Sequence, residues 1–320
     1  MRTISYSRYG SPEVIRIQES PKPQPSENEV LIKIYSSVVT PSDIAFRTGS
    51  PFISRFFTGL RKPVHVPGVE LAGVIEAVGE KVDAFKIGDK VYGSTVTEFG
   101  AHAEYKCLDQ SGVLAKIPKN MSFEEAICLA DGALTSLVFL RDVAQLKANQ
   151  HILINGASGA VGVYALQLAK YYGAETTAVC SHRNIELVKS QGADHIIDYT
   201  KDDFTLNHNR YDVIFDAVGK RTFRACKPAL TQDGLYMTTV PTLDILGGML
   251  ASAFGKGKKA KFVAAGLQQH ASNLEFLTKL AEEGHLSAVI DRTYPLEQIK
   301  EAHTYVESER KRGNVVIQMG

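Results

Sequence analysis

The sequence is poor in cysteine, lacks tryptophan and carries almost no net charge. Its 320 residues include 4 cysteines, and 36 Lys and Arg side chains balance 35 Asp and Glu. The cysteines form no close pair, which argues against a disulfide framework and a cysteine-based zinc site. A balanced charge gives no net field to attract DNA, RNA or anionic lipid, so we expect no nucleic-acid partner.

Long apolar runs are also missing. The opening segment MRTISYSRYGSPEV is polar throughout and does not resemble a secretory signal. One uncharged stretch, Ala148 to Ala169, has enough residues to span a bilayer, but it contains several polar side chains and three glycines. We therefore expect no integral membrane segment and a cytoplasmic location.

What the sequence does contain is two kinds of pattern, and the chain length favours two domains. Residues 1–121 hold short β-branched runs broken by Pro and Gly, typical of a barrel or sandwich. At Ser122, followed by Glu125, a capping box opens a helix, and strands and helices alternate over residues 122–265. Such alternation predicts an α/β domain with a parallel sheet. Residues 266–320 read as helix, extended segment, helix and strand.

The first helix of the α/β region follows the strand HILIN. Apolar side chains recur along it at helical spacing, which predicts one face packed on the sheet. These residues are Val161, Tyr164, Ala165, Leu168 and Tyr172.

Between that strand and helix lies a turn with glycines spaced G-x-x-G-x-x-G. Glycine lets a backbone pass close to a pyrophosphate, and the helix start offers free N–H groups to it. The pattern predicts dinucleotide binding, and the alternative is a structural turn with close helix–strand packing. The candidate contacts are Gly156, Ser158, Gly159, Ala160, Val161 and Gly162.

The end of the second strand indicates which dinucleotide binds. An acidic residue there selects NAD by bonding the ribose 2′-hydroxyl, but this chain has Ser181 and Arg183 in that region. Both can bond a 2′-phosphate, so the sequence favours NADPH. The alternative is that Ser181 caps the next helix while Arg183 is solvated.

Taken together, the motifs resemble the zinc-independent quinone oxidoreductase branch, which includes zeta-crystallin-like proteins, of the medium-chain dehydrogenase/reductase superfamily. The resemblance covers nearly the whole chain. Its elements are ISYSRYGSPEVIRI, NEVLIKIYSSVVTPSD, PGVELAGVIEAVGEKVDAFKIGDKVYG, NGASGAVG, GADHIIDY, YDVIFDAVG and GNVVI. It implies a GroES-like catalytic domain made from both ends of the chain and a Rossmann NADPH-binding domain inserted between them.

The resemblance also bears on zinc. Zinc-dependent relatives have Cys at the position of Thr40, His at that of Val69 and a third ligand near Asp131. Because a catalytic zinc needs three protein ligands, we expect no metal site there. The implied reaction is hydride transfer from NADPH to a quinone or an α,β-unsaturated carbonyl, acceptors that delocalise the incoming charge.

The sequence departs from the quinone reductase pattern Asn-Pro-x-Asp-x-Tyr. Thr40 replaces the Asn and Ala45 replaces the Tyr. Thr40 and Ser42 still offer hydroxyls and are the candidate catalytic residues. The alternative is that they cap a short helix, with Asp43 bonding backbone.

Further cofactor contacts follow from the resemblance. Thr135 corresponds to a nicotinamide contact, and Tyr199 to a tyrosine against the 2′-phosphate; the alternatives are a buried hydroxyl and a surface tyrosine. Asn314 lies where the catalytic domain returns to the cofactor. Three residues end later strands and are candidate backbone contacts or core: Val218, Gly219 and Val240.

One apolar segment, Leu243 to Phe254, is too short to span a bilayer. We expect it to border the acceptor pocket or a homodimer contact, in preference to a membrane surface. Two other functions stay open: an NADPH-binding protein with little turnover, and a metal-free alcohol dehydrogenase.

Overall fold

The computed structural model describes residues 1–253 and 257–320, and contacts divide the chain into two compact units. Unit 1 comprises Met1–Asp131 and Gln269–Gly320, and unit 2 comprises Gly132–Gln268. The sequence pattern predicts boundaries at 121/122 and 265/266. The first lies later because helix α3 (Phe123–Cys128), which opens with the expected capping box of Ser122 and Glu125, packs on strands of unit 1.

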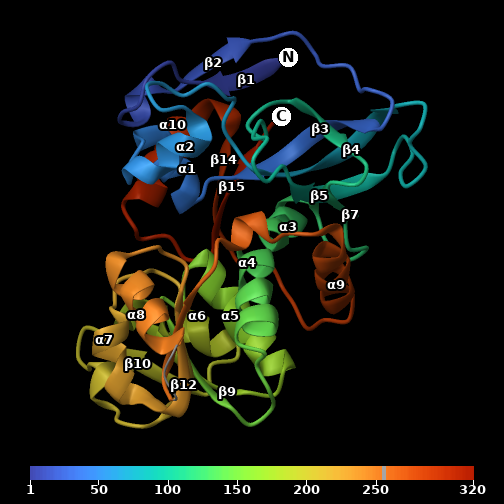
Figure 1. The fold of residues 1–320 in the computed structure, drawn as a ribbon. Coiled ribbons are helices and arrows are strands. Elements are labelled where there is room, and N and C mark those ends of the chain that lie inside the picture. Colours follow the sequence, from blue (N-terminus) through green and yellow to red (C-terminus); the bar gives the residue numbers. More distant parts are fainter. Residues whose placement is uncertain (254–256) are drawn as a thin grey trace. The chain divides into compact units, whose positions relative to one another are not determined.

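Unit 1 is built on a seven-stranded sheet. Six of its strands follow the order β14-β15-β3-β4-β5-β7, and the seventh, β6, pairs with β3. The last strand, β15, pairs antiparallel with β3, so the end of the chain completes the sheet begun near its start (Figure 1). A two-stranded sheet, β1-β2, lies apart from it in the pairing. The strands are β1 (Arg2–Ser5), β2 (Arg16–Glu19), β3 (Glu29–Val38), β4 (Glu70–Val78), β5 (Lys90–Ser94), β6 (Tyr105–Asp109), β7 (Val113–Lys116), β14 (Ile290–Pro295) and β15 (Asn314–Gln318).

Both segments of the chain supply the core of unit 1. Ile32 and Ile34 from β3 pack in one cluster with Val315 and Ile317 from β15, all at most 1% exposed. The members of this cluster recur at every second position of each strand, which is the two-residue period of a sheet. The helices of this unit are α1 (Pro41–Thr48), α2 (Arg55–Thr58), α3, α9 (Ala271–Glu282) and α10 (Ile299–Glu307).

Unit 2 contains six parallel strands in the order β10-β9-β8-β11-β12-β13. The chain starts in the middle of the sheet and moves outward in both directions, which confirms the predicted Rossmann topology. The strands are β8 (His151–Asn155), β9 (Glu175–Cys180), β10 (His195–Asp198), β11 (Tyr211–Asp216), β12 (Leu230–Thr238) and β13 (Lys259–Phe262). The helices are α4 (Leu134–Leu137), α5 (Ala160–Tyr171), α6 (Ile185–Ser190), α7 (Phe223–Cys226) and α8 (Leu243–Ala253).

Helix α5 is more buried than its sequence pattern predicted. Val163 and Leu166, outside the expected face, are as inaccessible as Leu168. The reason is that α4 packs on α5 as well: the Ser136 hydroxyl donates a hydrogen bond to the Val161 carbonyl at 2.7 Å. The expectation of a single packed face was therefore wrong for this helix.

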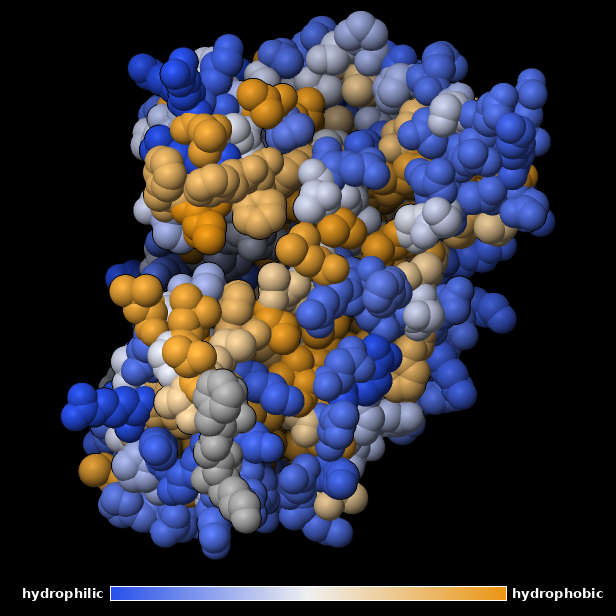
Figure 2. All heavy atoms as spheres, viewed as in Figure 1, coloured by the Kyte–Doolittle hydropathy of each residue, from blue (hydrophilic) through white to orange (hydrophobic). Residues whose placement is uncertain are grey.

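Among the described residues, exposed apolar side chains gather on α8 and around α2. On α8, Leu243, Leu246 and Leu250 are 50–89% exposed, while Phe254 lies outside the described residues. In unit 1, Phe52 and Phe56 are more than 60% exposed, and Figure 2 shows apolar side chains gathered over α2. In the part of the chain that the structure describes, none of the helices combines the length and the hydropathy that crossing a membrane would need.

Candidate functional site

The carboxyl ends of β8, β11 and β12 bring several candidate residues into contact. Gly156 follows β8 with φ of +79°, and a Cβ there would lie 2.5 Å from Cγ1 of Val218. Gly219 has φ of +65°, and its Cβ would lie 2.4 Å from Cγ2 of Val240. The fold therefore requires glycine at positions 156 and 219, and Val218 and Val240 remain 40% and 37% exposed at this edge.

The other two glycines of the turn differ in what requires them. A Cβ on Gly162 would lie 2.3 Å from the Gly156 carbonyl oxygen, so close packing explains that glycine. Gly159 has an ordinary negative φ of −79°, and its Cβ would meet only one atom, at 3.4 Å. Neither close packing nor backbone conformation requires glycine at position 159.

The first turn of α5 follows directly on Gly159. That residue is the N-cap and supplies no side-chain hydrogen bond, so the N–H groups at the start of α5, including those of Ala160 and Val161, have no capping side chain. The Ser158 oxygen accepts a hydrogen bond from Asn184 at 2.8 Å, which leaves its hydroxyl hydrogen for another partner. Positive dipole, free donors and an absent side chain together make a site for a phosphate.

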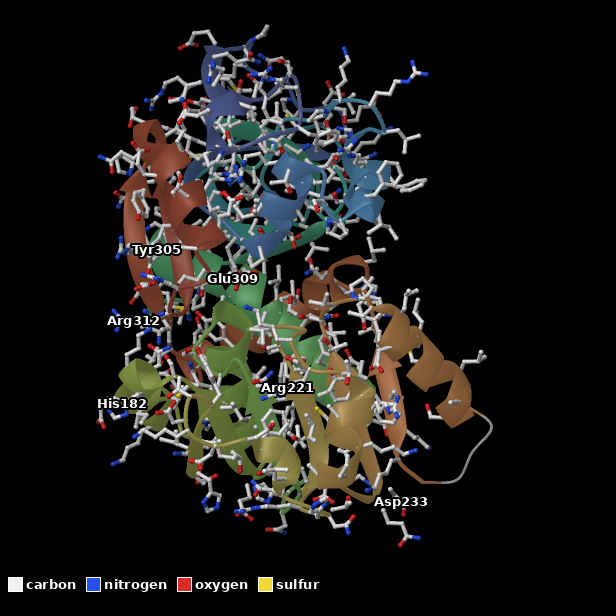
Figure 3. All side chains as sticks on the ribbon, turned by 90° about the vertical axis from the view of Figure 1, so that its left-hand side faces the viewer. His182, Arg221, Asp233, Tyr305, Glu309 and Arg312 are labelled. Carbon is white, nitrogen blue, oxygen red and sulfur yellow. The ribbon has the colours of Figure 1, made fainter. Side chains whose placement is uncertain are left out.

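The candidates for 2′-phosphate recognition gather at the ends of β9 and β10. Ser181 is the N-cap residue of the short helix His182–Asn184, yet its side chain makes no capping hydrogen bond. The Tyr199 N–H donates to the Cys180 carbonyl, which brings Tyr199 beside Ser181. Arg183 and Tyr199 are exposed, as is His182 in Figure 3. The structure thus brings Ser181, Arg183 and Tyr199 to one edge.

Two other cofactor candidates lie in different surroundings. Thr135, on α4, is half-buried, while the hydroxyl of the neighbouring Ser136 is taken up by backbone carbonyls. Asn314, in unit 1, is 1% exposed and donates a hydrogen bond to Asp131 at 2.8 Å. The observed role of Asn314 is thus to hold a carboxylate, and its contact with a cofactor stays a prediction.

The two candidate catalytic hydroxyls begin α1. Thr40 forms a capping box with Asp43: its hydroxyl accepts from the Asp43 N–H and donates to the Asp43 carboxylate at 2.7 Å. The helix-capping alternative is therefore realised for Thr40, which is 5% exposed. Ser42 is exposed.

Sequence reasoning missed Glu70, a buried carboxyl of unit 1 that lies near Asp43 and Asp131. Burial, together with the carboxylates of Asp131 and Asp43, raises the pKa of Glu70 well above its usual value. Burial likewise raises the pKa of Asp131, although Lys311 opposes the shift. Oε2 of Glu70 is buried without a hydrogen-bond partner among the described residues. Only the tertiary structure brings these three carboxyl groups together, because they lie far apart in the chain and no local pattern links them.

The positions at which zinc-dependent relatives hold their metal carry few donors. Val69 offers none, and the Thr40 hydroxyl is engaged by Asp43. Within residues 1–253 and 257–320, a single group of three His, Cys, Asp or Glu side chains is close enough to share a metal ion. That group lies in unit 2, whereas Thr40, Val69 and Asp131 belong to unit 1.

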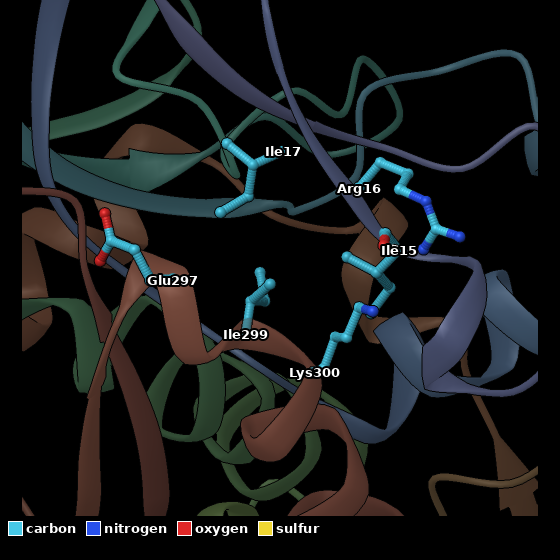
Figure 4. Close-up of a pocket in the computed structure, with 6 residues that line it drawn as sticks. All are labelled: Ile15, Arg16, Ile17, Glu297, Ile299 and Lys300. Carbon is cyan, nitrogen blue, oxygen red and sulfur yellow. Dashed lines mark hydrogen bonds between the residues drawn. The ribbon is translucent and has the colours of Figure 1, made fainter.

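A surface hollow of about 260 Å³ lies in unit 1 between β2 and α10 (Figure 4). Ile15, Ile17 and Ile299 line it, together with three charged residues at its rim: Arg16, Glu297 and Lys300. These charged groups already bond other parts of unit 1, as when Lys300 donates to Glu13 at 3.1 Å. The hollow therefore offers shape but no set of free reactive groups.

Family models match two parts of the chain. Residues 26–131 match the alcohol dehydrogenase GroES-like domain, and residues 191–317 match a domain described as zinc-binding dehydrogenase. These two matches cover much of the two units described above.

Whole-length relatives are also found. The chain is 31% identical to the chloroplast envelope quinone oxidoreductase homolog of Arabidopsis thaliana, with 99% of this chain and 98% of the relative covered. It is 34% identical to 2-methylene-furan-3-one reductase of Solanum lycopersicum, covering 99% of this chain and 79% of the relative. Among solved structures, the quinone oxidoreductase from Coxiella burnetii superposes with a TM-score of 0.89 at 27% identity, covering 100% and 99% of the two chains.

Proposed function

The chain belongs to the quinone oxidoreductase branch of the medium-chain dehydrogenase/reductase superfamily, and on this premise we propose that it passes a hydride from NADPH to its acceptor without a catalytic zinc ion. The protein is a nicotinamide-dependent oxidoreductase of the class that reduces quinones and α,β-unsaturated carbonyls.

The observation that carries the cofactor proposal is Gly159. Neither the backbone φ nor the packing at position 159 requires a glycine. The residue lies at the uncapped start of the twelve-residue helix α5. A bound pyrophosphate would approach the backbone there and accept hydrogen bonds from the N–H groups of Ala160 and Val161. The Ser158 hydroxyl, held from the other side by Asn184, would add one more donor.

NADPH in preference to NADH is supported by the edge at Ser181. No acidic side chain occupies the positions from Ser181 to Asn184, and the Ser181 hydroxyl is not used in capping. The guanidinium of Arg183 and the hydroxyl of Ser181 can both bond a 2′-phosphate. A carboxylate, which selects NAD, would repel that phosphate. Tyr199 would lie against the same phosphate.

In the proposed hydride transfer, the main task of the protein is to position the cofactor and the acceptor. NADPH supplies the hydride from its nicotinamide C4, and a quinone or enone delocalises the charge that arrives. The backbone at Val218, Gly219 and Val240 would hold the cofactor, with Thr135 proposed at the nicotinamide. The proton that completes the reduction would come from water or from a hydroxyl, and Ser42 is exposed to deliver one.

Zinc independence is supported by the donor set at Thr40, Val69 and Asp131. One is a hydroxyl directed at Asp43, one is a hydrocarbon, and the third is a carboxylate held by Asn314. A catalytic zinc site needs three protein ligands with N, O or S donors, and one carboxylate does not make it.

Homodimer formation and a cytoplasmic location complete the proposal. Exposed leucines on α8 form the kind of apolar surface that a subunit contact or an acceptor covers. None of the four cysteines is in a disulfide, which is typical of a reducing compartment. Light scattering of the purified protein tests the first point, and cell fractionation tests the second.

The deciding experiment follows NADPH oxidation with a panel of quinones, enones, saturated aldehydes and ketones, after a fluorescence titration has established NADPH binding. We expect turnover with quinones or enones and little with saturated carbonyls. Turnover restricted to saturated carbonyls, or tight NADPH binding with no turnover on any acceptor, would overturn the proposed reaction.

A further inference from the structure

A second chemically distinctive cluster lies in unit 2, at the opposite ends of the strands from the glycine turn. His151, Glu175 and His195 are the first residues of β8, β9 and β10, which are neighbours in the parallel sheet. In the register, His151 pairs with Glu175, and His195 pairs with Thr177. Since Glu175 and Thr177 are two apart on one strand, all these side chains leave the same face of the sheet.

The three side chains already approach one another closely. One ligand atom from each lies within 4.8 Å of the others. Nε2 of His195 is 2.7 Å from Oε1 of Glu175, and Nε2 of His151 is 4.0 Å from the same oxygen. Donor atoms around a tetrahedral zinc lie about 3.4 Å apart, as follows from metal–ligand bonds of about 2.1 Å. Side-chain adjustments of about an ångström would therefore centre the three donors on one ion.

The sheet holds one ligand firmly and leaves the other two adjustable. The His151 side chain is 13% exposed, its ring packs edge-on against Tyr211 at 5.0 Å, and its Nε2 lies 2.8 Å from the Thr177 hydroxyl. Glu175 and His195 are 50% and 46% exposed, so their rotation costs little packing. One fixed donor with two adjustable donors and access to water suits an ion with three protein ligands and an open fourth position.

We propose that His151, Glu175 and His195 bind one divalent transition-metal ion of the zinc class at the amino edge of the Rossmann sheet. Two imidazoles and a carboxylate are ligands that zinc accepts, and they come from three adjacent strands. The ion would tie these strands together and would take no part in hydride transfer, since β8 separates His151 from Gly156 by its whole length. The proposal is independent of the proposed reaction.

The test uses the full chain without a histidine tag, stripped with chelator and titrated with Zn²⁺ by calorimetry. We expect one ion per chain and a rise in Tm of several degrees at saturation. His195→Gln and Glu175→Gln, both at exposed positions, should each weaken binding more than about tenfold. The matched control is His208→Gln, another exposed histidine of unit 2, which should bind as the wild type does.

A spectroscopic readout separates this site from chance binding at cysteine. Co²⁺ bound by nitrogen and oxygen donors should show visible d–d absorption and no thiolate charge-transfer band. The d–d absorption should be lost in His195→Gln. NADPH should bind with the same affinity with or without Zn²⁺. Absence of stoichiometric binding, equal binding by His195→Gln and His208→Gln, or loss of NADPH affinity with zinc would each overturn the proposal. In the first case the cluster is a His–Glu ion pair only.

Discussion

The amide of Asn155, the last residue of β8, donates a hydrogen bond of 2.9 Å to the carboxylate of Asp216, the last residue of the neighbouring strand β11. The same fully buried carboxylate accepts hydrogen bonds from the backbone N–H groups of Val218, Gly219 and Arg221. One side chain thus fixes the edge at which the glycine turn and the Val218–Gly219 turn meet.

Asp216→Ala should destabilise unit 2 by more than about 3 kcal/mol, because several buried donors lose a charged acceptor at once. Asp216→Asn keeps the side-chain shape, but only one of its two terminal atoms can accept hydrogen bonds. Its loss of stability should therefore be smaller than that of Asp216→Ala. Urea unfolding measures both. The control is Asp233→Asn, at an exposed position on β12 that Figure 3 labels, and an equal effect there would contradict the role of Asp216.

Gly159→Ala should separate ligand binding from folding. Because the added methyl meets only one atom at an ordinary distance, Tm should change little, while the Kd for NADPH should rise more than about tenfold. Gly162→Ala, whose methyl would collide with the Gly156 carbonyl, should lower Tm markedly. Differential scanning fluorimetry and fluorescence titration give the two values. An unchanged Kd in Gly159→Ala would remove the pyrophosphate from this turn.

Arg183→Glu should change cofactor preference. Loss of one charge-assisted hydrogen bond, and its replacement by repulsion, should raise KM for NADPH by roughly 10-fold or more and leave KM for NADH within about threefold. Lys189→Glu makes the same charge reversal at an exposed position on α6 and serves as the control. Equal changes with the two cofactors would show that Arg183 does not recognise a 2′-phosphate.

The two hydroxyls at the start of α1 should behave differently. Thr40→Val removes a capping box and should cost about 1 kcal/mol of stability, which Thr40→Ser should largely restore. Ser42→Ala should leave stability unchanged and lower kcat on quinones and enones by about tenfold or more if its hydroxyl delivers the proton. Ser7→Ala is an exposed control in the same unit. Unchanged kcat in a Thr40→Val, Ser42→Ala double variant would exclude both hydroxyls from catalysis.

His303 should make unit 1 sensitive to mild acid. Burial lowers the pKa of His303 well below its usual value, and the nearby His102 and Arg47 act in the same direction. In the unfolded chain, His303 therefore binds a proton near pH 6.5, whereas in the folded protein it stays neutral at that pH. This contribution to stability is fully present above the pKa of the unfolded chain and is lost as the pH falls toward the lowered pKa of the folded protein.

Urea unfolding at pH 7.5 and pH 5 checks this loss. His303→Asn keeps an acceptor for the Arg47 side chain but does not titrate, so its stability should fall less between the two pH values. The exposed His208→Asn should retain the full pH dependence of the wild type. The same dependence in His303→Asn would assign the acid sensitivity to other groups.

Sequence patterns sufficed wherever neighbouring residues decide the structure. The capping box at Ser122, the strand–turn–helix around Gly156 and the alternation of strands and helices all depend on residues a few positions apart, and the structure has them. The strand order of the Rossmann sheet followed because parallel strands joined by helices admit few arrangements.

Only the tertiary structure decided which residues meet across strands. Asp216 under the glycine turn, Asp131 bonded to Asn314, the raised pKa of Glu70 and the group of His151, Glu175 and His195 all depend on register and on burial. No local pattern encodes these contacts, because sheet pairing brings together positions far apart in the chain. The scarcity of cysteine, which the sequence shows by itself, argued against thiolate metal sites. The fold is what places imidazole and carboxylate donors side by side.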